Sequence, residues 1–161
     1  MNIRLALVPE DYDQVWEIFK SVISEGDSFV FDPETKKEDM MKYWFAPSME
    51  TFVGIRDKIV VGSYFIKPNQ LDLGNHIANC GYMVHKQYRG QKIASLLCEH
   101  SINHAKSKGY TGMQFNIVVS TNLAAVNLWK NMGFEVTGTT PKGFRHKLFG
   151  MVDTFIMFKA L

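Results

Sequence analysis

The sequence predicts a single domain over residues 1–161 of the α/β (α+β) class, with a mixed, mainly antiparallel sheet flanked by helices. Three observations predict it. The length is that of one ordinary domain, and no linker, repeat or low-complexity tract divides the chain. Strand and helix patterns follow in the order β-α-α-β-β-β-α-β-α-β-β. The strand-helix-strand section within this order is typical of a parallel pair joined by a crossover helix.

Each element has a local signal. The first helix opens at Asp11, carries apolar side chains spaced for one buried face and stops at Gly26. Asp57-Lys58 is a candidate tight turn between two β-rich runs, which predicts a hairpin. The expected elements are a strand at 2–8, helices at 11–26 and 36–45, strands at 50–57, 58–67 and 77–85, a helix at 93–106, a strand at 113–119, a helix at 121–132, strands at 134–137 and 152–159, and a loop over 138–149.

Composition excludes several classes of protein. Lysine and arginine number 18 against 16 acidic residues, a net charge of +2 that does not favour a nucleic-acid partner. No apolar run reaches the roughly 18 residues of a membrane span. The two cysteines form no CxxC pair, so a reduced, cytoplasmic compartment is expected, with both thiols buried and inert. His100 and His104 share a helix face, but no HExxH pattern or third ligand accompanies them, and we expect no metal site.

The stretch most indicative of chemistry is 82–97, where a strand ends, a basic loop follows and a helix begins. The first-turn amides of a helix have no intrahelical partners, and the dipole makes that end positive, so the arrangement suits a pyrophosphate. Gly90 allows close approach of the backbone, while Arg89 and Lys92 add charge. A solvated basic turn before a helix is the alternative interpretation.

Residues 87–94, QYRGQKIA, resemble the Q/R-x-x-G-x-G/A loop of the GNAT superfamily of N-acetyltransferases. Residues 122–134, NLAAVNLWKNMGF, are similar to that family's N-x-x-A-x-x-L/F-Y-x-x-x-G-F helix. The resemblance implies the GNAT fold with two splayed central parallel strands, and acetyl-CoA as cosubstrate. It also implies a donor site with backbone N–H groups near Met83 and Val84 that polarise the thioester, formed by Met83, Val84, Arg89, Gly90, Gln91, Lys92, Ile93, Ala94, Ser95, Asn122 and Lys130.

Three departures from the family pattern bear on mechanism. Lys92 stands where the family has a second glycine, which is tolerable if its φ is that of a right-handed helix. Trp129 stands where many members have a tyrosine that protonates the leaving thiolate, and an indole cannot do so. The strand at 77–85 has no glutamate to act as base. Deprotonation through water is therefore expected, and Trp129 is expected to pack against the donor or the core.

Two asparagines occupy the expected central strands, where asparagine is depleted. Strand alternation lets Asn79 and Asn116 face one cleft if their strands are neighbours and splay apart. They are our catalytic candidates, placing the acceptor amine. Ordinary polar surface is the alternative. Together with Asn122 and the tail at 143–153, they resemble the GNAT branch of fungal acetyltransferases that act on proline analogues such as azetidine-2-carboxylate.

The sequence therefore predicts an N-acetyltransferase that moves an acetyl group from acetyl-CoA directly to the amine of a small molecule. An amino acid or a proline analogue is the candidate acceptor. Two alternatives stay open, a non-catalytic acyl-CoA binding module and an enzyme that acylates protein N-termini or lysines. We expect no metal, nucleic-acid or membrane partner, and a homodimer is the default assembly. Arg145 and His146, in the expected loop, are further candidates for meeting a substrate carboxylate.

Overall fold

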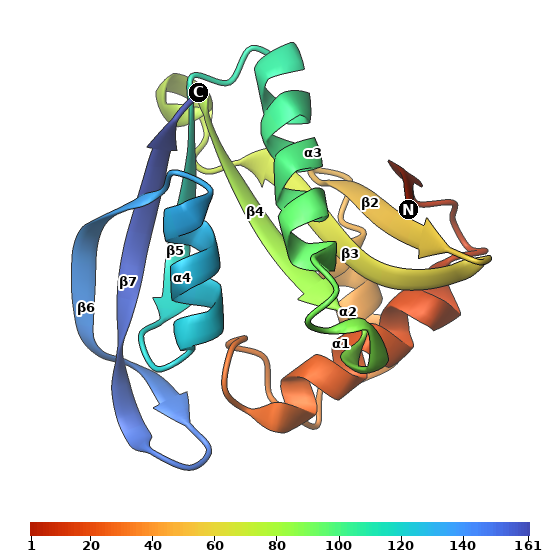
Figure 1. Cartoon of the computed structure of the whole chain (residues 1–161), viewed down its shortest axis with the longest axis horizontal. Coiled ribbons are helices and arrows are strands. Elements are labelled where there is room, and N and C mark those ends of the chain that lie inside the picture. Colours follow the sequence, from red (N-terminus) through yellow and green to blue (C-terminus); the bar gives the residue numbers. More distant parts are fainter.

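The computed structural model describes all residues, 1–161, and its elements follow the predicted order (Figure 1). The helices are α1 (Tyr12–Glu25), α2 (Lys37–Trp44), α3 (Ile93–Ser107) and α4 (Leu123–Asn131), with 3-10 turns η1 (Asp72–Gly74) and η2 (Lys86–Tyr88). The strands are β1 (Asn2–Leu5), β2 (Glu50–Arg56), β3 (Ile59–Pro68), β4 (Ile77–Val84), β5 (Gly112–Val119), β6 (Glu135–His146) and β7 (Gly150–Ala160).

The strands form one seven-stranded sheet in the order β1-β2-β3-β4-β5-β7-β6. Every neighbouring pair is antiparallel except β4 and β5, which run parallel and are connected through α3. The predicted mixed, mainly antiparallel sheet is confirmed. The hairpin turn between β2 and β3 is also confirmed, since Asp57 and Lys58 have φ of 51° and 67°, the positive values that a tight hairpin turn requires.

Helices cover both faces of the sheet (Figure 1). Each face has its own apolar core. On one face α1 and α2 bury side chains such as Phe19 and Trp44 against the sheet. On the other face α3 and α4 bury Leu97 and Trp129. Strand β4 supplies both cores, because its even-numbered side chains point to the α3/α4 face and its odd-numbered ones to the α1/α2 face.

The expected loop over 138–149 is wrong. Strand β6 continues to His146, and the turn before β7 is short. Pairing with β7 is interrupted between Thr140 and Phe144, where Pro141 has no N–H to donate and Lys142 is left-handed with φ 53°. Pairing then resumes. The glycine- and threonine-rich composition of this stretch belongs to an irregular strand rather than a loop.

Candidate active site

Strands β4 and β5 diverge along their length (Figure 1), and residues of both strands line a cavity. Two residue pairs join these strands, Ile77 with Gly112 and Ala78 with Met113. At the next residue of β4 the backbone pairing stops, and a side chain makes the contact between the strands: Asn79 Nδ2 donates to the Gln114 carbonyl oxygen at 2.8 Å. The cavity, of about 670 Å³, occupies the gap beyond this bridge, and its volume is that of a small-molecule site. The strand pair is therefore splayed, as expected.

The edge of β4 that faces the gap keeps unpaired peptide groups. The His85 N–H donates to the Val61 carbonyl at 2.9 Å in the ladder with β3. Alternate residues of an antiparallel strand face the same neighbour, so the Met83 N–H also points to β3. This contradicts the donor role expected for the Met83 N–H. The N–H groups that point into the gap are those of Tyr82 and Val84.

The loop after β4 enters α3 through two left-handed residues, Gly90 with φ 77° and Lys92 with φ 61°. The condition under which a side chain at Lys92 would be tolerable, a right-handed helical φ, is not met. Lys92 adopts the left-handed conformation that favours glycine, the residue found at this position of the GNAT-like motif. Its side chain does not cap the helix. The first of the α3 backbone bonds runs from the Leu96 N–H to the Lys92 carbonyl at 3.1 Å. The N–H groups of residues 93–95 are left for an anion.

A carboxylate from the end of α1 offsets part of the charge of this loop. Arg89 Nη1 lies 2.8 and 3.0 Å from the two carboxylate oxygens of Glu25, and Lys86 Nζ lies 3.9 Å from one of them. Lys92 has no ion pair. Glu25 lines the cavity and was missed by the sequence analysis, since nothing in the local pattern links the end of α1 to a loop 64 residues away.

Most of the residues expected to bind the donor line the cavity, and three lie outside its wall. Gln91 turns away, because its Oε1 accepts a hydrogen bond from Arg56 Nη1 at 2.6 Å. Ser95 on α3 and the exposed Lys130 on α4 also lie outside the wall. Those that line it are Met83, Val84, Arg89, Gly90, Lys92, Ile93, Ala94 and Asn122.

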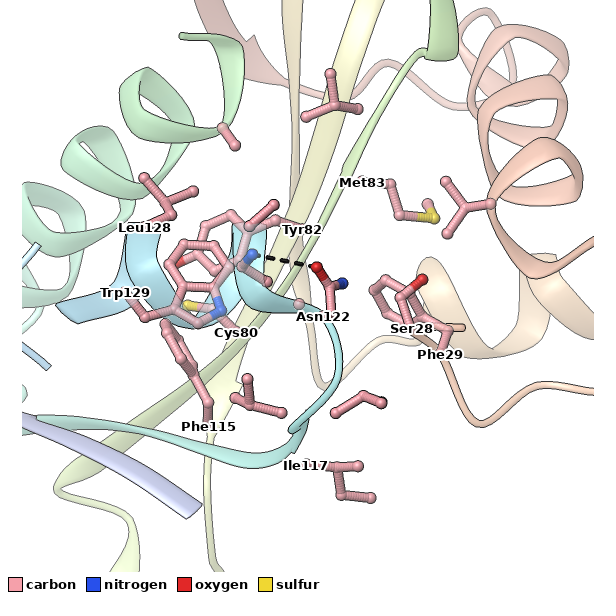
Figure 2. Close-up of a pocket in the computed structure, with 18 of the residues that line it drawn as sticks. Ser28, Phe29, Cys80, Tyr82, Met83, Phe115, Ile117, Asn122, Leu128 and Trp129 are labelled. Atoms are coloured by element: carbon pink, nitrogen blue, oxygen red, sulfur yellow. Dashed lines mark hydrogen bonds between the residues drawn. The ribbon is translucent and has the colours of Figure 1, made fainter. Parts of the chain in front are cut away.

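The start of α4 forms the second side of the cavity. Asn122 caps this helix, its Oδ1 accepting from the Ala125 N–H at 3.1 Å, which leaves the amide Nδ2 available to a ligand (Figure 2). Trp129 is 9% exposed, and its ring lies 5.0 Å from those of both Tyr82 and Phe115. Figure 2 shows this aromatic group on one side of Asn122 and Met83 on the other. Trp129 therefore packs in the core, as expected.

The third side of the cavity comes from the segment between α1 and α2, residues 27–31, together with Tyr43 of α2. Phe31 and Tyr43 pack edge to face, as do Tyr43 and Phe65 of β3. The Phe31 and Tyr43 centroids lie 4.8 Å apart, and the Tyr43 and Phe65 centroids 6.0 Å apart. Burial raises the pKa of the Tyr43 hydroxyl. No motif or residue spacing in this segment indicates a role in the site.

The asparagine pair faces the cavity on the side that α1 and α2 cover. Asn79 is 9% exposed, and Asn116 lies on a β-bulge where the β5–β7 register shifts. Asn116 Oδ1 accepts from Gln114 Nε2 at 2.8 Å, and its Nδ2 donates to Asn69 Oδ1 at 2.7 Å. Both asparagines line one cleft, as strand alternation predicted, and Lys67 of β3 lines it beside them.

Of the other sequence candidates, Cys80 lines the cavity, whereas His146, Arg145 and Cys98 lie away from its wall. The His146 side chain is buried, and its Nδ1 accepts from the N–H groups of Leu148 and Phe149 at 3.0 and 3.3 Å, so it holds the β6–β7 turn. Arg145 does not line the cavity either. Both cysteines are buried as expected, and burial raises the pKa of the Cys98 thiol to about 12. No group of three His, Cys, Asp or Glu side chains is placed to hold a metal ion, and no helix has the length and apolarity of a membrane span.

Comparison with known proteins identifies the family. The acetyltransferase (GNAT) family model matches residues 12–134. The solved structure of a GCN5-related N-acetyltransferase from Kribbella flavida is 34% identical, covers 99% of this chain and 97% of its own, and superposes with a TM-score of 0.94. The chain belongs to the GNAT acetyltransferase family, which confirms the resemblance seen in the two motifs.

Two further proteins are similar to this chain. N-acetyltransferase aca1 of Schizosaccharomyces pombe is 31% identical over 98 residues, which is 60% of this chain and 47% of the relative. The match thus spans about half the length of that fungal protein. A GNAT superfamily phosphinothricin acetyltransferase from Sinorhizobium meliloti, solved in complex with acetyl-CoA, shares the fold with a TM-score of 0.88 at 16% identity, over 99% of this chain and 88% of its own.

Proposed function

We propose that the protein transfers an acetyl group from acetyl-CoA to the amine of a small molecule, by direct transfer in a ternary complex. The observation that carries this proposal is one cavity with two chemically different ends. A helix N-terminus with left-handed Gly90 and Lys92 lies at one end, and the amides Asn79 and Asn116 lie at the other. The unpaired edge of β4 runs between them. Family membership and the acetyl-CoA complex of a protein with the same fold support it.

Acetyl-CoA supplies the acetyl group as a thioester. Its pyrophosphate fits the unpaired N–H groups of residues 93–95 and the ammonium of Lys92. The N–H groups of Tyr82 and Val84 are the donors that can stabilise charge on the thioester oxygen during attack, a contribution that ranks among the largest in acyl transfer. Asn122 Nδ2 is a further donor on the α4 side of the cavity.

The acceptor amine attacks the thioester carbon, forming the C–N bond as the C–S bond breaks and the thiolate leaves. The amine loses one proton, and no carboxylate of β4 or β5 is available to take it. Two carboxylates outside these strands line the cavity, Glu25, which is held by Arg89, and Asp27, and in our proposal the proton passes to water. The thiolate leaves without a protein acid, because a thiol pKa near 8.5 makes it a stable enough anion. Asn79 and Asn116 contribute proximity by orienting the amine.

Amino acids, including proline analogues, are the acceptor class that we propose. An amide can accept from an amine and donate to a carboxylate, and two amides face the same cleft. The likeness to a fungal N-acetyltransferase agrees with the narrower resemblance read from the motifs. A cytoplasmic location and a homodimeric assembly stay predictions.

The first experiment measures the melting temperature with acetyl-CoA and, as control, with NAD. A ligand at 100 times its Kd adds about 2.7 kcal/mol to stability, which is an easily measured shift. Release of free thiol is then followed with a panel of amino acids, peptides with free N-termini and lysine-containing peptides. Stabilisation by acetyl-CoA with thiol release on amino acids is the expected result. Stabilisation without thiol release on any amine favours a binding module, and release on peptides alone favours a protein acetyltransferase.

A further inference from the structure

Lys67 is a cation of the cavity wall with no acidic partner. It lies near the end of β3, is only partly exposed, and has no carboxylate within 4.0 Å and no hydrogen bond. Arg89, at the other end of the cavity, is paired with Glu25. Partial burial of a charge is costly unless an opposite charge meets it. An anionic ligand group at this end of the cavity would provide that charge.

Sheet geometry places Lys67 beside the asparagine pair. Lys67 pairs with Asn79 in the β3–β4 ladder, and Phe65 pairs with Gly81. From Ser63 to the end of β3, odd-numbered residues point to the α1/α2 face, as odd-numbered residues of β4 do, so these side chains share one surface. The hydrogen bond from Asn116 Nδ2 to Asn69 Oδ1 holds Asn116 close to the end of β3, because Asn69 directly follows that strand.

The remaining surface at this end is apolar and rigid. Phe65 leans over Gly81, where a Cβ atom would lie 2.6 Å from the ring. Tyr43 and Phe31 pack edge to face above it. Such a wall suits a small aliphatic side chain or a saturated ring.

The donor's phosphates do not reach Lys67. The phosphate-binding loop follows the end of β4, whereas Lys67 is paired with Asn79 near its start. Five residues of extended strand separate Asn79 from Val84, or about 16 Å at 3.3 Å per residue. The anion that meets Lys67 must therefore belong to the acceptor.

We propose that Lys67 binds the carboxylate of the acceptor and thereby selects amines that carry a carboxylate beside a small apolar group, as in a small apolar or cyclic amino acid. The inference rests on the proposed function and deepens it by assigning a specificity-determining residue. Asn79 and Asn116 hold the nitrogen, Lys67 the carboxylate and the aromatic wall the apolar remainder. Lysine suits this role because its ammonium is a compact charge on a flexible side chain. A single charge is enough to bind a carboxylate, so the two-pronged contact that arginine makes is not required.

The test compares Lys67→Met with wild type on amino acids and on their uncharged carboxamides, using proline, alanine and leucine. Loss of a charged hydrogen bond is expected to raise KM for the amino acids about 10- to 100-fold, with little change in kcat. Lys67→Arg should recover most of this loss. Lys106→Met removes a lysine exposed on α3 and is the matched control. The acetyl-CoA melting shift of Lys67→Met should equal that of wild type.

Carboxamides should be poor acceptors for the wild type and unaffected by Lys67→Met. An equal loss on both acceptor types, or a wild type that prefers carboxamides, would overturn the assignment. Calorimetric binding of the same amino acids to CoA-saturated protein tests Lys67 independently of turnover. If the wild type binds amino acids through their carboxylate, Lys67→Met abolishes this binding and no thiol is released on any amine, the acceptor site at Lys67 is supported and the proposed catalysis is refuted. No carboxylate-dependent binding would refute the site.

Discussion

Replacing Lys92 by glycine is expected to make the ligand-free protein more stable and its donor binding weaker. Lys92 has φ 61° and ψ 14° at the N-terminus of α3 and makes no side-chain cap. A left-handed conformation costs an ordinary residue about 1–2 kcal/mol. Glycine removes that cost but adds about 0.4–1 kcal/mol of unfolded-state entropy. The net gain is about 0.5–1 kcal/mol, which raises Tm by about 1–4 °C for a chain of this size.

Lys92→Met is the matched control, because it removes the same ammonium and keeps a Cβ atom. Its Tm should lie within about 1 °C of wild type, while both variants should bind acetyl-CoA about 3- to 10-fold more weakly through loss of one partly screened charge. Differential scanning calorimetry gives the first quantity and isothermal titration the second. If Lys92→Gly melts no higher than Lys92→Met, Lys92 is not strained and the account of this loop is wrong.

Three further predictions concern stability and the acceptor side. Asn79→Ala removes the bridge to the Gln114 carbonyl and should lower the free energy of unfolding by about 1 kcal/mol in urea titrations, whereas a surface asparagine would give no change. Gly81→Ala places a methyl group 2.6 Å from the Phe65 ring and should cost about 1–3 kcal/mol, so an unchanged Tm would show that the ring moves freely. Burial opposes ionisation of Asp11, but hydrogen bonds from Arg4 and the Leu7 N–H outweigh it and lower the carboxyl pKa. Asp11→Asn should therefore cost about 2 kcal/mol at pH 7, a difference present above pH ~4 and lost as the pH falls through the native pKa, and a pH-independent difference would contradict this.

The features that the sequence predicts well are those with a local physical cause. Alternation, helix periodicity and turn chemistry gave the element order, including the Asp57-Lys58 hairpin. The two asparagines were predicted to share a cleft because side-chain direction in a strand follows parity. The prediction of a loop over 138–149 was wrong. The strand there is interrupted near Pro141, and the residues that suit such an interruption are also those typical of a loop.

The parts of the site that the sequence did not predict depend on contacts between distant segments. Glu25 meets Arg89 only because α1 ends beside the phosphate-binding loop. Lys67 is an ordinary strand lysine until the β3–β4 register places it next to Asn79. The direction of the Met83 N–H depends on whether that residue hydrogen-bonds to β3 or faces β5. The alternation of side chains along the strand does not determine this.

The short pairing between β4 and β5 makes the middle of the sheet a seam between consecutive halves of the chain. Strands β1 to β4 lie on one side and β5 to β7 on the other. Two residue pairs, the Asn79 bridge and the hydrogen bond from Asn116 to Asn69 join the two sides. Local opening at such a seam requires less free energy than global unfolding, so the amide hydrogen of Thr111, which bonds to the His76 carbonyl across the seam, should exchange early in the free protein. A ligand that binds both sides of the seam would slow exchange in both halves together, and would join them into one cooperative unit.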